Sequence, residues 1–149
     1  MDVPSLSMSD TLARELRRVA FSRRMSFGYD EIIKKLGNEK RGLEASAGRG
    51  EIAASKRISR LVLFSRNGSE RFYRRVERLL AANTPRVLGC MLDRDDDFLG
   101  HILTGRNRRI KIMMVGHKDS VSAILRALVA SSNTASADFL RISGNSEIL

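Results

Sequence analysis

Apolar and polar positions alternate at helical spacing most clearly in residues 69–80, SERFYRRVERLL. Five apolar side chains form one helical stripe and four arginines form another: Phe72, Tyr73, Val76, Leu79 and Leu80, against Arg71, Arg74, Arg75 and Arg78. At about 100° per residue, the centres of the two stripes lie about 150° apart on the helix. One face can therefore be buried while the other faces a partner. Ser69 suits the N-cap, and Glu70 suits the positive end of the helix dipole.

Three further helices are predicted. They cover residues 9–24, residues 29–36, and a closing helix with its apolar stripe at Val121, Ile124, Leu125 and Leu128. Ser9 or Asp10 can cap the first helix, and Gly37 is a typical C-terminal stop for the second. Arginines cover much of the polar side of the first helix, as they do in residues 69–80.

Short apolar runs predict four strands, over residues 58–64, 86–92, 98–103 and 109–115. The acidic run 93–97 and the Gly-containing run 105–107 are typical of turns. The last three strands follow one another through these short turns, a pattern that predicts an antiparallel meander.

These elements predict an α+β fold, with an antiparallel three- to four-stranded sheet packed by helices on one face and preceded by a helical N-terminal region. Strand, helix, meander, helix and terminal strand resembles the βαββαβ order of ferredoxin-like domains. Helix, meander and helix over residues 69–131 resembles the element order of double-stranded-RNA-binding domains. The lysine-rich start of that family's final helix is reduced here to His117 and Lys118.

The same patterns divide the chain into four segments. Residues 1–36 form the helical N-terminal region, and residues 58–131 form the α+β core domain. Between them, residues 37–57 are rich in glycine and small polar side chains, which predicts a flexible linker or loop. Residues 132–149 form a tail, in which the run around Phe139 and Leu140 could add one terminal strand.

Charge changes the picture most. The 149 residues carry 27 lysines and arginines against 17 aspartates and glutamates, a net charge of +10, and arginine supplies 21 of the 27. Arginine favours planar, bidentate contacts with phosphate or carboxylate. The excess is spread along the chain instead of being confined to a tail, so a folded surface carries it. Such a surface indicates a phosphate backbone or an anionic membrane as partner.

The sequence therefore favours a non-enzymatic nucleic-acid-binding protein, with RNA as the favoured ligand and little sequence preference. The predicted contacts come from the helix at 69–80 and from a second basic cluster near the turn at 105–107: Arg71, Arg74, Arg75, Arg78, Arg106, Arg108, Arg109 and Lys111. Six phenylalanines, two tyrosines and no tryptophan are few for a base-stacking platform, which favours recognition of the backbone or of duplex shape.

Two alternatives remain open. A peripheral membrane or matrix-type assembly protein, of a kind found among viral accessory proteins, would use the same basic surface on anionic lipid and could form a homodimer. A small enzyme could use His117 with the acidic run Asp93, Asp95, Asp96 and Asp97, but a run in extended conformation points to both faces and favours a solvated turn. We predict no catalytic residue, metal or cofactor.

The remaining signals concern location. The single cysteine, Cys90, lies in an apolar run, so no disulfide framework is available. The first ten residues lack a basic start and an apolar run, and no stretch reaches the length of a membrane span. We therefore expect a cytoplasmic or nuclear protein that is not secreted and has no transmembrane segment.

Overall fold

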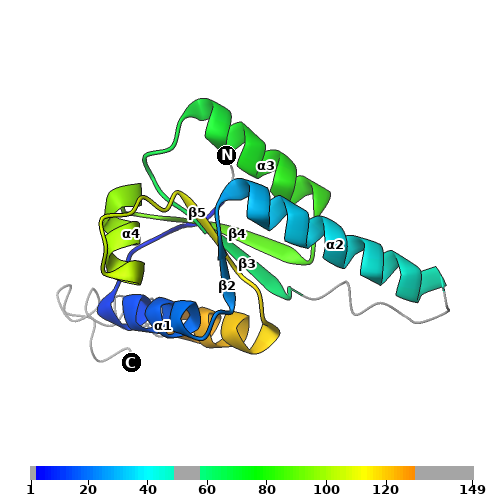
Figure 1. The fold of residues 1–149 in the computed structure, drawn as a ribbon, viewed down its shortest axis with the longest axis horizontal. Helices are drawn as coiled ribbons and strands as arrows, with labels where there is room; N and C mark the ends of the chain where they lie inside the picture. Colours follow the sequence, from blue (N-terminus) through cyan, green and yellow to red (C-terminus); the bar gives the residue numbers. More distant parts are fainter. Residues whose placement is uncertain (1–2, 49–57, 130–149) are drawn as a thin grey trace, which may run out of the picture.

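Five strands form one mixed sheet with helices on both of its faces in the computed structural model, which describes residues 3–48 and 58–129 (Figure 1). The elements are β1 (Ser5–Leu6), α1 (Asp10–Phe21), β2 (Met25–Phe27), α2 (Tyr29–Gly48), β3 (Arg60–Phe64), α3 (Glu70–Ala82), β4 (Val87–Leu92), α4 (Asp96–Thr104) and β5 (Ile112–Val115), followed by a helix over residues 118–129.

The strand order is β1-β4-β3-β5-β2. β4 is parallel to both β1 and β3, whereas β5 is antiparallel to β3 and β2. A helix, α3, connects β3 to β4, and such a crossover returns the chain in the same direction. The α+β class is confirmed, but the prediction of an antiparallel sheet of three to four strands was wrong, because the sheet is mixed and has five strands.

Successive residues of the central strands face opposite cores. Leu61 and Leu63 of β3 pack with α1, α4 and the helix at 118–129, while Val62 and Phe64 pack with α2 and α3. All four side chains are fully buried. A strand with four successive buried apolar residues needs cover on both sides, so the prediction of helices on one face only was wrong.

Two predicted helices are confirmed with their caps. Ser9 accepts a hydrogen bond from the Leu12 N–H at the start of α1, and Ser69 accepts one from the Phe72 N–H at the start of α3. The closing helix is confirmed over residues 118–129, and α3 ends at Asn83, whose backbone N–H donates to the Leu80 carbonyl.

The predicted strand at 98–103 was wrong, because these residues belong to α4. Asp95 occupies the N-cap position, Asp96 and Asp97 supply a negative first turn, and Gly105 ends the helix in the left-handed region with φ of 70°. The antiparallel meander is therefore absent from the described residues. Both element orders that depended on it, the ferredoxin-like and the double-stranded-RNA-binding one, were wrong.

The predicted linker was wrong for residues 37–48, which continue α2. This half of α2 has little to bury, but Glu39 forms an ion pair of 3.0 Å with Arg60 and a second one with Arg86. These partners, in β3 and directly before β4, hold the helix where its own sequence pattern does not predict it. Residues 49–57 and the tail at 132–149, with its candidate strand, lie outside the described residues.

The N-terminal region contributes directly to the sheet. β1 and β2 are its two edge strands, and α1 and α2 pack on its opposite faces. Within the described residues, no helix combines the length and the apolar character that crossing a membrane requires.

Candidate nucleic-acid interface

A basic hollow of about 690 Å³ opens where three segments meet at one end of the sheet. Its walls come from the start of α2, the start of α3 and the segment that leads into β5: Phe27, Gly28, Tyr29, Ser69, Arg71, Phe72, Arg75, Arg108, Arg109, Ile110, Lys111 and Ile112. Five of these side chains are cationic, and no carboxylate is among the lining residues that the structure describes.

Strand direction explains why the three segments converge. Phe64 at the end of β3 pairs with Ile112 at the start of β5, and Phe27 at the end of β2 pairs with Met113. β5 lies between the other two strands and runs antiparallel to both. The helices that follow β2 and β3 therefore begin beside the segment that precedes β5.

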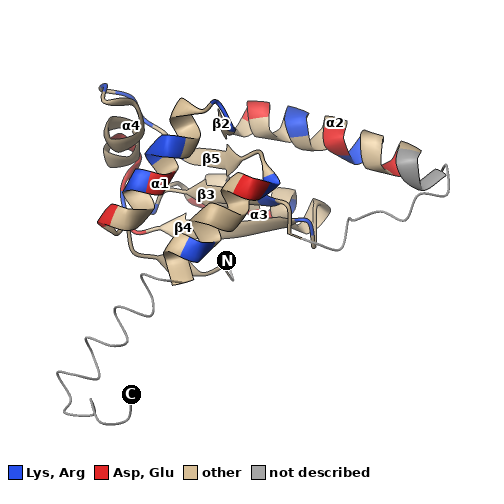
Figure 2. Cartoon of the chain, turned by 90° about the horizontal axis from the view of Figure 1, so that it is seen from below, with Lys and Arg blue, Asp and Glu red and all other residues tan. Residues whose placement is uncertain are grey.

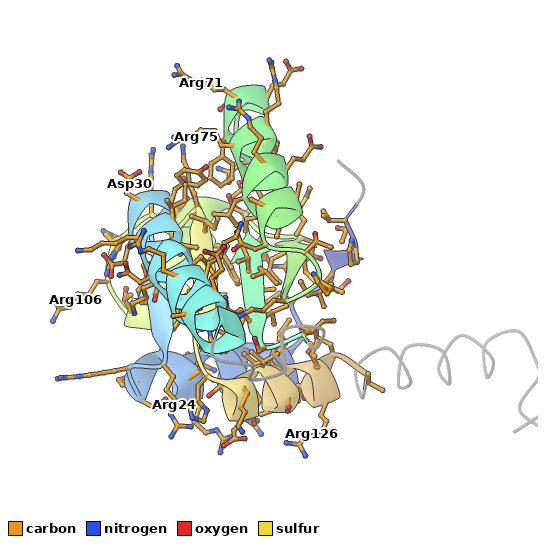
Figure 3. All side chains as sticks on the ribbon, turned by 90° about the vertical axis from the view of Figure 1, so that its right-hand side faces the viewer. Arg24, Asp30, Arg71, Arg75, Arg106 and Arg126 are labelled. Atoms are coloured by element: carbon orange, nitrogen blue, oxygen red, sulfur yellow. The ribbon has the colours of Figure 1, made fainter. Side chains whose placement is uncertain are left out.

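The predicted binding residues divide into two groups. Arg71, Arg75, Arg108, Arg109 and Lys111 line the hollow. The other three do not: Arg74 pairs with Glu70 at 3.4 Å, Arg78 lines a neighbouring groove, and Arg106 is exposed outside the lining. Figure 3 shows Arg71 and Arg75 together near Asp30, with Arg106 pointing away to one side.

Two of the lining arginines lie on aromatic rings. The guanidinium carbon of Arg75 is 3.9 Å from the centre of the Tyr29 ring, and that of Arg108 is 5.3 Å from the centre of the Phe27 ring. A carboxylate oxygen of Asp30 lies 3.8 Å from Arg75 on an exposed rim. The rings orient both cations without neutralising them.

The backbone adds to the positive potential. The N-terminal ends of α2 and α3 both reach the hollow, and each helix end carries a partial positive charge. Gly28 starts α2 from a left-handed conformation with φ of 91°, which glycine adopts at little cost. Its carbonyl accepts the Ile32 N–H at 3.1 Å.

The sequence reasoning missed the aromatic part of this site. Phe27, Tyr29 and Phe72 are lining residues, although the small number of aromatic residues suggested that no such surface existed. Phe72 lies on the apolar stripe of α3 and is only partly buried. The Phe27-Gly28-Tyr29 step, a glycine between a strand and a helix, was the available signal.

The acidic run and His117 lie at opposite ends of the sheet. Asp93 to Asp97 follow β4, whereas His117 follows β5, which runs in the opposite direction to β3 and β4. His117 Nδ1 accepts the Asp119 N–H at 3.2 Å and so begins the last helix. A shared centre of His117 and the aspartates is therefore excluded by the topology.

The aspartates have structural partners. Asp95 bonds Arg66 at 2.8 Å, and this hydrogen bond raises the pKa of the Arg66 guanidinium above its usual value. Asp96 is buried and accepts hydrogen bonds from the Asn67 side chain and the Asp97 N–H, both at 2.9 Å. No cluster of three histidines, cysteines or carboxylates with metal-binding geometry occurs among residues 3–48 and 58–129.

Similarity of this chain to known proteins is found among solved structures. No family model matches the chain, and no curated protein matches it. Among solved structures, it is similar to a protein of unknown function from Bacillus halodurans, at 12% identity and a TM-score of 0.49, covering 81% of this chain and 98% of that one. It is also similar to the Giardia lamblia 15.5 kD RNA-binding protein, at 13% identity and a TM-score of 0.47, covering 80% and 83% respectively. At these scores neither likeness assigns a function to this chain.

Proposed function

We propose that this protein binds RNA without catalysing a reaction, and that the basic hollow between α2, α3 and the segment at 108–112 is its binding site. The observation that carries the proposal is the convergence of five cations and two helix N-termini on one concave surface. Each feature alone is common on protein surfaces. Together they form an anion-binding site large enough for a few nucleotides.

The aromatic residues indicate which form of RNA the hollow suits. Arginine planes and aromatic rings both stack on unpaired bases, and unpaired segments are where proteins mostly read RNA. Arg75 on Tyr29 and Arg108 on Phe27 present two such planes beside cations that can hold phosphates. We therefore favour single-stranded or looped RNA over a regular duplex. A concave site also suits a strand better than a flat lipid surface.

The test compares two double variants with the same charge change. Arg75→Gln with Arg108→Gln removes both ring-stacked cations from the hollow, whereas Arg74→Gln with Arg106→Gln removes cations from the same helix and the same loop outside it. Fluorescence anisotropy with labelled single-stranded RNA at low salt measures the affinity. The first variant should lose about 100-fold, or about 2.8 kcal/mol, and the second less than about 3-fold.

Salt dependence and lipid binding complete the experiment. The slope of log affinity against log salt should fall by up to about 1.4 in the first variant, since each lost phosphate contact removes about 0.7 for a single strand and the two arginines can contact phosphates as well as bases. Equal losses in the two variants would mean diffuse attraction without a site. If wild-type protein binds anionic liposomes in flotation but no RNA at low salt, the proposal is wrong.

A further inference from the structure

A second, more apolar groove of about 310 Å³ lies between α2 and α3 and adjoins the basic hollow. Ile33 and Leu79 contribute to its walls, and Lys40 and Arg78 are its cations. Tyr29 lines both the groove and the hollow, so the two depressions adjoin at this ring. No carboxylate is among the described residues that line the groove.

The cations continue from one depression into the other. Arg71 and Arg75 line the hollow and Arg78 lines the groove. They stand four and three residues apart on α3, which puts them on one face, with rises of about 6 and 4.5 Å along the axis. The spacing provides a row of positive charges that leads out of the hollow and along the two helices.

Gly37 has no role inside the protein that would require glycine. It lies in the interior of α2, where glycine costs about 1 kcal/mol relative to alanine. Apart from its two chain neighbours and its own helix backbone, no heavy atom lies within 4 Å of the position that a Cβ would occupy, and its φ is not in the left-handed region. Ile33, Leu36, Gly37 and Lys40 share the face of α2 that lines the groove, so the missing side chain widens the groove itself.

The groove is built for an external occupant with an apolar side and a negative side. Ile33 is 43% exposed there. Two exposed hydrogen bonds of 3.4 Å join α2 to α3 at the groove, from the Tyr29 hydroxyl to the Arg75 carbonyl and from Lys40 Nζ to the Ala82 carbonyl. A single nucleic-acid strand has this character, because sugars and bases can lie on apolar side chains while phosphates reach cations. Continuity with the basic row favours such a strand over an acidic amphipathic helix.

We infer that RNA bound in the basic hollow continues past Tyr29 into the groove between α2 and α3, where Gly37 leaves room for it and Arg78 and Lys40 hold its phosphates. The inference rests on the proposed function. It extends the site by about two helical turns and predicts an affinity that grows with the length of the strand.

Two glycines of α2 give a matched test. Gly42 also has nothing within 4 Å of its Cβ position, but it is exposed and does not line the groove. Gly37→Ala and Gly37→Gln narrow the groove, whereas Gly42→Ala and Gly42→Gln do not. Anisotropy is measured with single-stranded RNA of about 4 and about 12 nucleotides, a range that matches known single-strand sites.

Substitutions at position 37 should leave the affinity for the short RNA unchanged and lower that for the long RNA, about 3-fold with Ala and 10-fold or more with Gln. Substitutions at position 42 should change neither affinity. All four variants should melt at or above the wild-type temperature, because glycine is replaced by a better helix former. Arg78→Gln with Lys40→Gln should also weaken only the long RNA.

The outcomes separate the two proposals. If wild-type protein binds neither RNA, the proposed function itself fails. If both RNAs bind but position 37 behaves like position 42, the strand does not enter the groove and this inference is overturned. It is also overturned if an acidic amphipathic helical peptide binds in a Gly37-dependent way while the long RNA does not, since the groove would then dock a protein.

Discussion

The helices α1 and α3 are built alike and lie on opposite faces of the sheet (Figure 1). Each starts with a serine N-cap and buries an apolar stripe. Each also carries exposed arginines, which are Arg14, Arg17 and Arg18 on α1 and Arg71, Arg74, Arg75 and Arg78 on α3. Basic residues thus lie on the helices of both faces of the sheet. Figure 2 shows this for α1 on one face and for α2, which packs beside α3, on the other.

The surroundings of the two helices differ. α3 begins beside the start of α2 and the segment at 108–112. Together with the end of β2, these neighbours add two aromatic side chains to Phe72 of α3, and three more cations. On α1, Arg18 pairs with Glu15 at 3.1 Å and lines a small hollow of about 200 Å³, whose lining has no aromatic side chain in the part of the chain that the structure describes. Periodic arginines on a helix therefore do not make a site. The candidate site depends on neighbouring elements, which add a concave surface, aromatic rings and further cations.

The largest effect is expected at Gly100, where α4 packs against the backbone of the loop at 106–111. A Cβ at Gly100 of α4 would lie 1.4 Å from the Arg108 carbonyl oxygen, so Gly100→Ala must displace the backbone that carries Arg108. We expect a loss of about 3 kcal/mol or more in the free energy of unfolding, measured in urea. RNA affinity should fall as well, at temperatures where the variant is folded.

The matched control for this change is Gly89→Ala in β4. There the Cβ would lie 2.4 Å from a methyl group of Leu80 on α3, and that side chain can rotate away. A smaller loss of stability with intact RNA binding is expected. Intact RNA binding in Gly100→Ala would show that the loop at 106–111 does not build the site.

The second effect tests whether the core beneath α1 excludes water from the Cys90 thiol. Cys90 is buried with α1 in the core on that side, and burial raises the pKa of its thiol to about 11 from 9.0. The folded state then holds the proton over a pH range in which the unfolded state releases it, so stability falls as pH rises from about 9 to about 11. The loss is at most about 2.7 kcal/mol.

The measurement is urea unfolding at several pH values for the wild type and for Cys90→Ala. Between about pH 9 and pH 11, the free energy of unfolding of the wild type should fall more than that of Cys90→Ala. A thiol that reacts with iodoacetamide at pH 8 as fast as a free cysteine would contradict a sealed α1 layer.

The third effect compares the two arginine stripes directly. Arg71→Gln with Arg75→Gln should weaken RNA binding about 30-fold, or about 2 kcal/mol, because both side chains line the hollow. Arg14→Gln with Arg17→Gln on α1 should weaken it less than about 3-fold by anisotropy. Equal effects would make the two helices equivalent, and the comparison would fail.

The smallest effect concerns the serine N-caps that α1 and α3 have in common. Ser9→Ala and Ser69→Ala each remove a cap hydrogen bond of 3.1 Å to the third following N–H. Each should lower the free energy of unfolding by about 1 kcal/mol in thermal or urea unfolding. Since the two caps have the same geometry, losses that differ by more than about 1 kcal/mol would show that one helix depends on its neighbours more than the other does.

Parts of this fold follow directly from local patterns. The bounds predicted for α1, α3, β3, β4 and β5 lie within three residues of those observed, and the closing helix was predicted from its apolar stripe alone. α4 also had its signals, in Asp95 to Asp97 before the apolar residues and Gly105 after them, but the short apolar run at 98–103 fits a strand as well as a helix. The second half of α2 lacked such signals, because its support comes from Arg60 and Arg86.

The candidate site divides in the same way. The sequence by itself determined that a basic surface exists and that Arg71, Arg75, Arg108, Arg109 and Lys111 are on it, since charge and helical period are local properties. Only the tertiary structure decided which cations stand together, because this depends on the directions of β2, β3 and β5. Strand direction results from pairing between residues far apart in the chain, and no local pattern encodes it. The same pairing puts Tyr29 under Arg75 and opens the groove beside Gly37.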